Sequence, residues 1–447
     1  MAKKSRVNEL IKNPRKAFFI LSIPILISMF VQTTYNIVDT AFIGRMGSEP
    51  IAALTFTFPI IFILVTINAS LGIGMGARIS RMLGAKNKKE AENTAMHGII
   101  LSLIFALALF ILNLVFLRGS FILLGASGNV LEYSMQYMSI IMGGIFLMFP
   151  AYVMSNIFSA QGNTKIPMKI QIISMLTNII LDPIFIYTLK LGVAGAAIAT
   201  VISFGVALIL SIYYLRKYSH LEINFNQFKY SKEVIRDIIA IGLPSSLMML
   251  MVSIYAMFAN RIMVHFGVDY VAAFGISTRL ESVVTTPIIA FAISMVTIVG
   301  MLYGAKKYGL LRDTIRYCIK TAILITIGIG ALGFIFSHLL VRIFTSDPNL
   351  ISLSAAYLRI SIFSYPFLAI TMITSRALHG MRLGMPGFVI NAIRVLVLAV
   401  PISYLFVFLF DFGYISVAVA SILGAAGASI IAYILLEKAM IKINRKG

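Results

Sequence analysis

Charged residues are scarce in this chain, and so are the residues that hold metals or disulfides. Asp, Glu, Lys and Arg together make up 12% of its 447 residues, about half the fraction of an ordinary soluble domain. The single cysteine, Cys318, excludes an internal disulfide framework and any cluster of thiolate ligands, and the five histidines never fall at ligand spacing. The sequence therefore contains no readable metal site and is not that of an ordinary soluble domain.

Apolar residues are abundant instead. They make up 60% of the chain, and the mean hydropathy is +0.96. Twelve apolar runs follow one another between residues 17 and 436, and most are longer than the roughly 20 residues that a helix needs to cross a bilayer. The sequence predicts an all-α polytopic membrane protein with twelve transmembrane helices.

The net charge of +21 could indicate a nucleic-acid partner, so the placement of the charges has to decide. Most of the 37 Lys and Arg residues lie before the first apolar run or in loops on the same side of the predicted membrane, including residues 6–16, 84–89 and 216–236. This distribution follows the positive-inside rule and predicts that both termini are cytoplasmic. The expected partners of the basic residues are membrane lipids, not nucleic acid.

The second half of the sequence repeats the first at a spacing of 220 residues. The matches include Pro24 with Pro244, Tyr35 with Tyr255, and the tripeptide at 84–86 with that at 304–306. The chain is therefore predicted to be two copies of a six-span unit, an N-terminal lobe at 1–225 and a C-terminal lobe at 226–447. Because six is even, both copies enter the membrane from the same side, as in transporters built of parallel repeats.

A polar stripe interrupts the first apolar run. Gln32, Tyr35, Asn36 and Asp39 stand at positions i, i+3, i+4 and i+7, so they share one side of a helix. A carboxylate inside a membrane span costs roughly 2.5 to 3.5 kcal/mol on insertion scales, which favours a functional role. The second copy has Ala259 in place of Asp39, so the repeated scaffold does not need the acid.

A second stripe lies in the fifth span, where Ser174, Asn178 and Asp182 follow at four-residue steps. Pro183 comes directly after Asp182, so a capping carboxylate at a helix end is an alternative interpretation. Thr200 in the sixth span is a weaker candidate, because a threonine in a helix commonly bonds its own backbone.

If Asp39 and Asp182 face each other, two chemistries are open. Two nearby carboxylates in a low-dielectric site do not easily both stay ionised, so one would hold a proton. Alternatively, Asp39, Asn178, Asp182 and Thr200 supply four oxygen ligands to Na⁺, a small hard cation. The sequence does not choose between proton and sodium coupling, and we expect no cofactor besides the coupling ion.

Pro24 lies in the first span, about two turns before the stripe begins. It removes one backbone hydrogen bond and permits a kink, so it is a candidate hinge. Pro244 repeats it without the acid, so a kink alone would belong to the scaffold.

The second lobe has its own charged residues within an apolar run. Arg279 and Glu281 are two residues apart, a spacing that does not place them side by side on a helix. Glu281 matches Ile61 in the first copy. Tyr255 and Met257 lie in a segment rich in methionine and aromatic residues, which indicates either helix packing or a cavity for several ligands. Structural pairing and a cavity function remain alternatives for this set.

Four segments of the chain are distinctive: PILISMFVQTTYNIVDTAFIGRMG at 24–47, GAKNKKEAE at 84–92, SAQGNTKIP at 159–167 and TNIILDPIFIY at 177–187. Together with the twelve spans in two six-span repeats, they resemble the multidrug and toxic compound extrusion (MATE) family over essentially the whole chain. The acids in the first lobe are similar to those of the DinF-like branch, whereas the NorM-like branch has its cation site in the second lobe.

This resemblance implies a V-shaped, two-lobe antiporter of the cell membrane, expected to be a monomer and not an enzyme. It would alternate between outward-open and inward-open states and export small drugs or toxins, cationic and amphipathic, in exchange for H⁺ or Na⁺. By this resemblance, the cation and proton site is formed by Asp39, Asn178, Asp182 and Thr200, with Gln32, Tyr35 and Asn36 beside it. The resemblance also implies that the first helix bends at Pro24. A lipid-linked sugar or lipid flippase of the same superfamily is the alternative.

Overall fold

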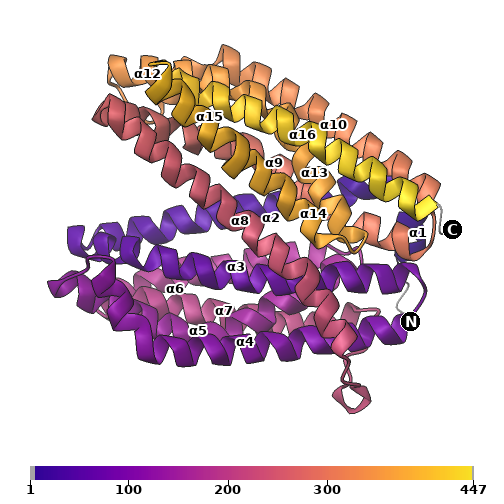
Figure 1. The fold of residues 1–447 in the computed structure, drawn as a ribbon. Coiled ribbons are helices and arrows are strands. Elements are labelled where there is room, and N and C mark those ends of the chain that lie inside the picture. Colours follow the sequence, from indigo (N-terminus) through magenta and orange to yellow (C-terminus); the bar gives the residue numbers. More distant parts are fainter. Residues whose placement is uncertain (1–5, 445–447) are drawn as a thin grey trace. The chain divides into compact units, whose positions relative to one another are not determined.

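The computed structural model describes residues 6–444, and every secondary-structure element among them is a helix. Twelve helices are long and apolar enough to cross a membrane, so the all-α fold and the number of spans are confirmed (Figure 1). The first six are α2 (Pro14–Gly44), α3 (Ser48–Gly84), α4 (Lys88–Leu123), α5 (Gly128–Ala160), α6 (Lys165–Pro183) with the π-helix η1 (Ile184–Thr188), and α7 (Gly192–Tyr218).

The other six spans form the second copy. They are α8 (Lys232–Phe266), α9 (Val268–Gly304), α10 (Tyr308–Ile335), α12 (Pro348–Ser361) with η3 (Ile362–Ser364) and α13 (Tyr365–Gly380), the run α14 (Gly384–Ala392), η4 (Ile393–Ala399), α15 (Val400–Tyr404) and η5 (Leu405–Leu409), and α16 (Ile415–Asn444). Shorter helices are α1 (Val7–Lys12), η2 (Phe225–Gln227) and α11 (Ser337–Arg342).

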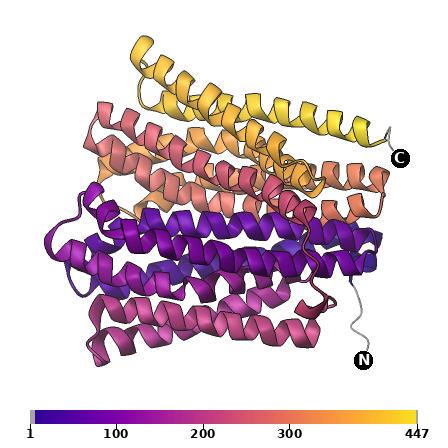
Figure 2. The same cartoon turned by 60° about the horizontal axis from the view of Figure 1, so that its bottom comes forward.

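The chain divides into two compact units, and each unit is a bundle whose helices run side by side (Figures 1 and 2). Among the described residues, the first unit comprises 6–9 and Ile23–Gly242, and the second comprises Leu10–Ser22 and the residues from Leu243 onward. Helices α2 and α8 are therefore each shared between the units, and the division falls just before Pro24 and just before Pro244. The predicted lobes at 1–225 and 226–447 divide the chain by its sequence repeat, whereas the compact units divide it by the contacts between residues.

The repeat extends to the backbone conformation. Residues with a positive φ recur 220 positions apart, at Gly47 and Gly267 (126° and 122°), Lys86 and Lys306 (60° and 56°), and Gly162 and Arg382 (80° and 68°). The π-helix η1 likewise has its counterpart in η5. Both copies therefore have the same turns between the same helices.

Gly162 offers a direct test of this shared turn. With φ at 80°, an alanine there would be strained, and we expect Gly162→Ala to lower the free energy of unfolding by about 1 kcal/mol. Arg382→Lys at the equivalent position keeps a Cβ and the positive charge, so it should change the stability little. Thermal unfolding of both variants in detergent measures the difference, and equal losses would contradict the strain argument.

The first unit is built around α5, which packs against α3, α4 and α7. Its core includes the buried side chains of Phe121, Met138, Ile145 and Phe149. Helix α7 also packs closely on η1, because a Cβ at Gly195 would lie 2.6 Å from the carbonyl oxygen of Phe185. This close approach places the end of α6 beside α7.

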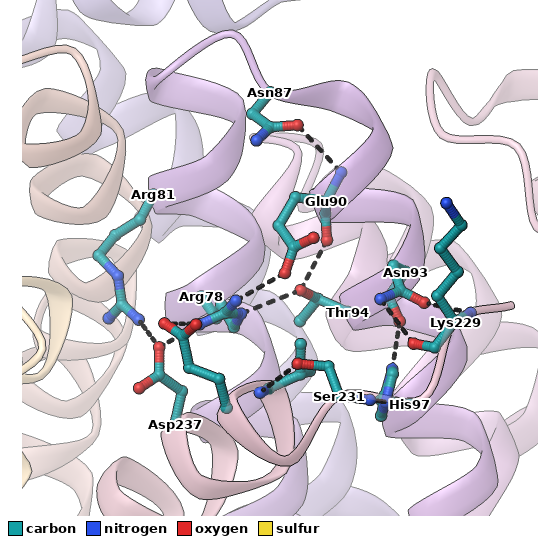
Figure 3. A network of polar contacts seen from close by, with 12 residues as sticks. Arg78, Arg81, Asn87, Glu90, Asn93, Thr94, His97, Lys229, Ser231 and Asp237 are labelled. Atoms are coloured by element: carbon teal, nitrogen blue, oxygen red, sulfur yellow. Dashed lines mark hydrogen bonds and ion pairs between the residues drawn. The ribbon is translucent and has the colours of Figure 1, made fainter.

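A buried network of ion pairs joins the start of α8 to the first unit (Figure 3). Arg78 of α3 pairs with Glu90 of α4 at 2.6 Å and with Asp237 of α8. Arg81 pairs with the same carboxylate of Asp237 at 3.3 Å, and the Arg78 Nε donates to the Thr94 hydroxyl at 3.3 Å. The side chains of Arg78, Arg81 and Asp237 are almost fully buried, so the network holds three charges away from solvent.

The segment before α8 lies along α4 and is held there by hydrogen bonds (Figure 3). Asn93 bonds both backbone groups of Lys229, at 3.1 Å to the N–H and 3.0 Å to the carbonyl oxygen. The Ser231 N–H donates to His97 Nε2 at 3.0 Å, and His97 Nδ1 contacts the Asn93 carbonyl oxygen at 2.8 Å. These two bonds assign the neutral imidazole with its proton on Nδ1, because Nε2 has to accept.

Glycines allow the backbones of α3 and α8 to touch. A Cβ at Gly74 would lie 2.1 Å from the Ile238 carbonyl oxygen, and one at Gly242 would lie 2.5 Å from that of Ser70. The equivalent contact in the second unit joins α2 to α9, where Ser22 donates to Ser294 at 2.9 Å. Ala17, Ile298 and Met301 occupy the positions that match Asp237, Arg78 and Arg81. The charged network therefore belongs to one copy alone.

Candidate functional site

The polar stripe of α2 divides into two parts. Tyr35 and Asp39 point toward the interior of the first unit: the Tyr35 hydroxyl lies 3.3 Å from Thr200 Oγ1, and Asp39 is 9% exposed. Gln32 and Asn36 are exposed and bond each other at 3.4 Å, and Gln171 donates to Gln32 at 2.8 Å. The structure thus brings half of the stripe to Thr200, whereas the other half forms a separate surface chain of amides.

Helix α6 contributes the second group of polar side chains. Asn178 and Asp182 have no exposed surface. The Asn178 amide donates to Asp182 Oδ1 and to Thr200 Oγ1, both at 3.3 Å, so one amide links an acid of α6 to a hydroxyl of α7. Ser174 instead donates to the Ser203 carbonyl oxygen at 2.9 Å, which fastens α6 to α7.

Asp39 and Asp182 lie close enough for their carboxyl groups to interact electrostatically. The η1 segment just after Asp182 is tied to α2, because the Tyr187 hydroxyl donates to the Phe42 carbonyl oxygen at 2.5 Å. The structure therefore assembles Tyr35, Asp39, Asn178, Asp182 and Thr200 from three helices of the first unit.

Three oxygen atoms of this cluster are buried without a hydrogen-bond partner in the described structure: Asp39 Oδ1, Asn178 Oδ1 and Asp182 Oδ2. A buried acceptor without a donor costs about 1 to 3 kcal/mol, and more when it is charged. A proton on one carboxyl group, or a small cation held by carboxylate, amide and hydroxyl oxygens, would satisfy these atoms. Within residues 6–444, no three His, Cys, Asp or Glu side chains are grouped so as to hold a metal ion. A cation here would therefore depend on the neutral oxygens as well.

Tyr137 of α5 belongs to the same cluster and was not predicted from the sequence. It is 4% exposed, lies near Thr200, and interacts electrostatically with Tyr35 and Asp39. One signal could have found it, because Tyr357 stands 220 residues later, just as Tyr255 follows Tyr35.

Pro24 is buried within α2, and the helix continues through it from Pro14 to Gly44. The Ser28 hydroxyl donates to the Pro24 carbonyl oxygen at 2.9 Å, one turn along. The boundary between the compact units falls at Ser22 and Ile23, next to this proline. Its role as a hinge stays a prediction.

The candidates of the second lobe do not behave as one group. Glu281 and Tyr255 are partly buried, whereas Met257 is 63% exposed and Arg279 is exposed. The first two residues carry polar groups inside the second unit, and the other two lie on its surface.

Comparison with known sequences identifies several relatives. The MatE family model matches the chain twice, at residues 24–184 and 244–405, which bears out the repeat. A multidrug export protein, MepA of Staphylococcus aureus, is 27% identical over 95% of this chain and 94% of its own length. An FAD transporter of Shewanella oneidensis is 29% identical over 86% of each chain.

A solved structure shows the same fold. It is described as the outward-facing conformation of a multidrug resistance MATE family transporter of the MOP superfamily. It is 30% identical to this chain, covers 100% of both chains and superposes with a TM-score of 0.94.

Proposed function

Because the chain belongs to the MatE family of membrane transporters, we propose that it is a secondary active antiporter exporting small organic molecules against an inward-moving ion. The observation that carries the proposal is the set of three unpaired oxygens on Asp39, Asn178 and Asp182. They lie in a multi-pass membrane protein, where buried acids are costly and are usually functional.

The coupling chemistry follows from those atoms. An ion can drive transport only if it binds two conformations with different affinity. Asp39 Oδ1 and Asp182 Oδ2 have no donor in the described structure and the two carboxyl groups interact with each other, so a conformation that brings them together favours a bound proton or cation. A conformation that separates them or opens them to water would release it. The acids in the first lobe are also our reason for favouring the DinF-like branch.

The proposed cargo is a small, cationic and amphipathic drug or toxin. The name of the MepA relatives, multidrug export protein, supports drugs as the class of cargo. The proposed location is the cell membrane with both termini cytoplasmic, because basic residues gather in the loops on that side. The FAD transporter among the relatives makes an anionic cofactor the competing cargo, and flipping of a lipid or lipid-linked sugar is a more distant one.

Efflux from proteoliposomes tests the proposal and identifies the ion. The protein is reconstituted, and export of ethidium is followed by fluorescence after a pH jump at constant Na⁺, and after a Na⁺ jump at constant pH with choline as the balancing cation. We expect one of the two jumps to raise the export rate about tenfold or more over the rate without a gradient.

Vesicles without protein control for passive leakage, and FAD replaces ethidium in a parallel series. Export that ignores both gradients would exclude ion-coupled antiport. Gradient-driven export of FAD without export of ethidium would keep the antiporter and replace the cationic cargo.

A further inference from the structure

The second unit contains a polar cluster at positions equivalent to those of the first-unit site. Tyr255 of α8 matches Tyr35, Tyr357 of α12 matches Tyr137, and Ser421 of α16 matches Thr200. Both Ser421 and Tyr357 lie near the Tyr255 hydroxyl. The two units therefore share a frame of two tyrosines and one hydroxyl residue.

The charges added to this frame differ between the units. In the second unit Ala259 replaces the acid of α2, and the carboxyl group comes from Glu281 on a different helix, α9. Glu281 lies near the Ser361 hydroxyl and interacts electrostatically with Tyr255, Tyr357 and Tyr365. The second site is thus a carboxyl group among three tyrosines.

The polar groups of this cluster are incompletely satisfied. The hydroxyls of Tyr255 and Tyr365 are buried and lie near Ser421 and Ser361, but neither forms a hydrogen bond of good geometry in the described structure. Tyr357 and Tyr365 are almost fully buried, whereas Tyr255 and Glu281 are partly exposed. Among residues 6–444 no ion pair of Glu281 is formed. An acid inside a membrane protein is usually paired, so the absence of an ion pair at Glu281, which has the Ser361 hydroxyl beside it, points to a positively charged ligand.

A positive charge also lies near Tyr255. Arg394 interacts electrostatically with Tyr255, and its Nε is buried without a hydrogen-bond partner. It belongs to the π-helix η4, which is held close to α16, because a Cβ at Gly424 would lie 3.0 Å from the Arg394 carbonyl oxygen. The matching stretch of α6 stays α-helical, and π-helical insertions frequently mark functional sites.

Glu281 and the tyrosine rings have complementary chemistry for one type of ligand. A carboxylate attracts an organic cation, and the face of an aromatic ring attracts the same charge. A large cation without hydrogen-bond donors suits this site better than a small hydrated ion, because aromatic rings do not replace water ligands. Arg394 would repel a second positive charge, so the cationic group should bind closer to Glu281 than to Arg394.

We propose that Glu281 and the ring of Tyr255 bind the positively charged group of the exported molecule, with Tyr357 and Tyr365 lining the site. This inference rests on the proposed function and divides the work between the units. The first unit binds the coupling ion, and the second unit selects the cargo by its charge.

Equilibrium binding to the purified full chain tests the proposal without any gradient. The probes are tetraphenylphosphonium, a monovalent organic cation, and triphenylphosphine oxide, an uncharged molecule of related shape. We expect Glu281→Gln to weaken tetraphenylphosphonium binding about tenfold or more and to change binding of the neutral probe less than about twofold. Arg279→Gln is the matched control, because it removes an exposed charge from the same helix and should change neither.

A second pair of variants examines the ring and does not depend on the stability of the Glu281 variant. Tyr255→Phe keeps the aromatic face and removes a hydroxyl that lies near Ser421 but forms no hydrogen bond of good geometry, so we expect cation binding within about twofold of the original. Tyr255→Leu removes the face and should weaken cation binding about three- to tenfold. Equal effects of Phe and Leu would overturn the role of the ring.

The remaining outcomes separate this inference from the proposed function. Equal weakening of both probes by Glu281→Gln would mean a structural role and would overturn the inference. The inference would also be overturned if Glu281→Gln left binding of both probes unchanged but removed the ion dependence of export, because Glu281 would then bind the coupling ion. Failure of ion-driven export in the unaltered protein, with charge-selective binding intact, would overturn the antiport proposal alone.

Discussion

Asp39→Asn is expected to abolish ion-driven export while the protein still folds and binds its cargo. Asparagine has nearly the shape of aspartate, yet it neither takes up a proton nor carries the charge that attracts Na⁺. Without an ion that binds two conformations differently, a gradient has nothing to act on. Gradient-driven ethidium efflux from proteoliposomes should therefore fall at least about tenfold, toward the rate of vesicles without protein. We expect Asp182→Asn to behave in the same way.

Asn36→Ala is the matched control for the Asp39 variant. Asn36 lies on the same helix three residues earlier, but its side chain is exposed and bonds Gln32. Its removal should leave the efflux rate within about twofold. Equilibrium binding of tetraphenylphosphonium serves as the second control, since it should survive Asp39→Asn. Gradient-driven efflux at the original rate in both Asp39→Asn and Asp182→Asn would contradict the assignment of the coupling site.

Asp237→Ala should lower the free energy of unfolding by about 3 to 5 kcal/mol, more than Gly162→Ala or Glu233→Ala. The carboxylate balances the guanidinium groups of Arg78 and Arg81, and all three side chains are almost fully buried. Its removal leaves Arg78 with the partly exposed Glu90 as its main partner and removes a partner of Arg81. Denaturation of the purified variant in detergent, followed by circular dichroism, measures the loss.

Glu233→Ala is the comparison for Asp237→Ala. Its carboxylate lies on the same helix, one turn earlier and 3.8 Å from Arg78, but the side chain is 66% exposed. Pairs of this kind contribute about 0 to 1 kcal/mol, so the variant should be nearly as stable as the original protein. A similar loss of unfolding free energy in both variants would show that the stability depends on negative charge at the start of α8, and not on the buried ion pairs.

The membrane spans were predictable because the bilayer requires long apolar segments, and the repeat was predictable because equivalent turns require similar residues. A span has to be apolar for about 20 residues, and a turn that needs a positive φ recurs wherever the same helices are joined. The tripeptide at 84–86 and its copy at 304–306 therefore carried reliable information, and Lys86 and Lys306 indeed have the same left-handed conformation.

The exact facing of the polar stripe was harder to predict. At 3.6 residues per turn, the pair Gln32 and Asn36 is rotated by roughly 60° from the pair Tyr35 and Asp39. A four-residue pattern on one side of a helix can therefore divide between a buried face and an exposed face, as it does here.

The Arg78 network shows what sequence reasoning could not supply. Arg78 and Arg81 stand near the end of a span, where basic residues are expected anyway, and Asp237 is 159 residues away from Arg78. Nothing in the local pattern distinguishes a solvated charge from a paired one. Only packing of α8 against α3, through Gly74 and Gly242, brings these residues together.

The exchange of helix segments between the two units has a consequence for biogenesis. Residues 10–22 emerge from the ribosome long before the rest of the second unit, yet they complete that unit, where Ser22 bonds Ser294, 272 residues later. The first unit in turn stays unfinished until residues 232–242 of α8 have been made. Domains usually fold in the order of synthesis, N-terminal first. Residues 10–22 meet their partners in α9 only after that helix has been made, so we expect the two units to be completed together and not one after the other.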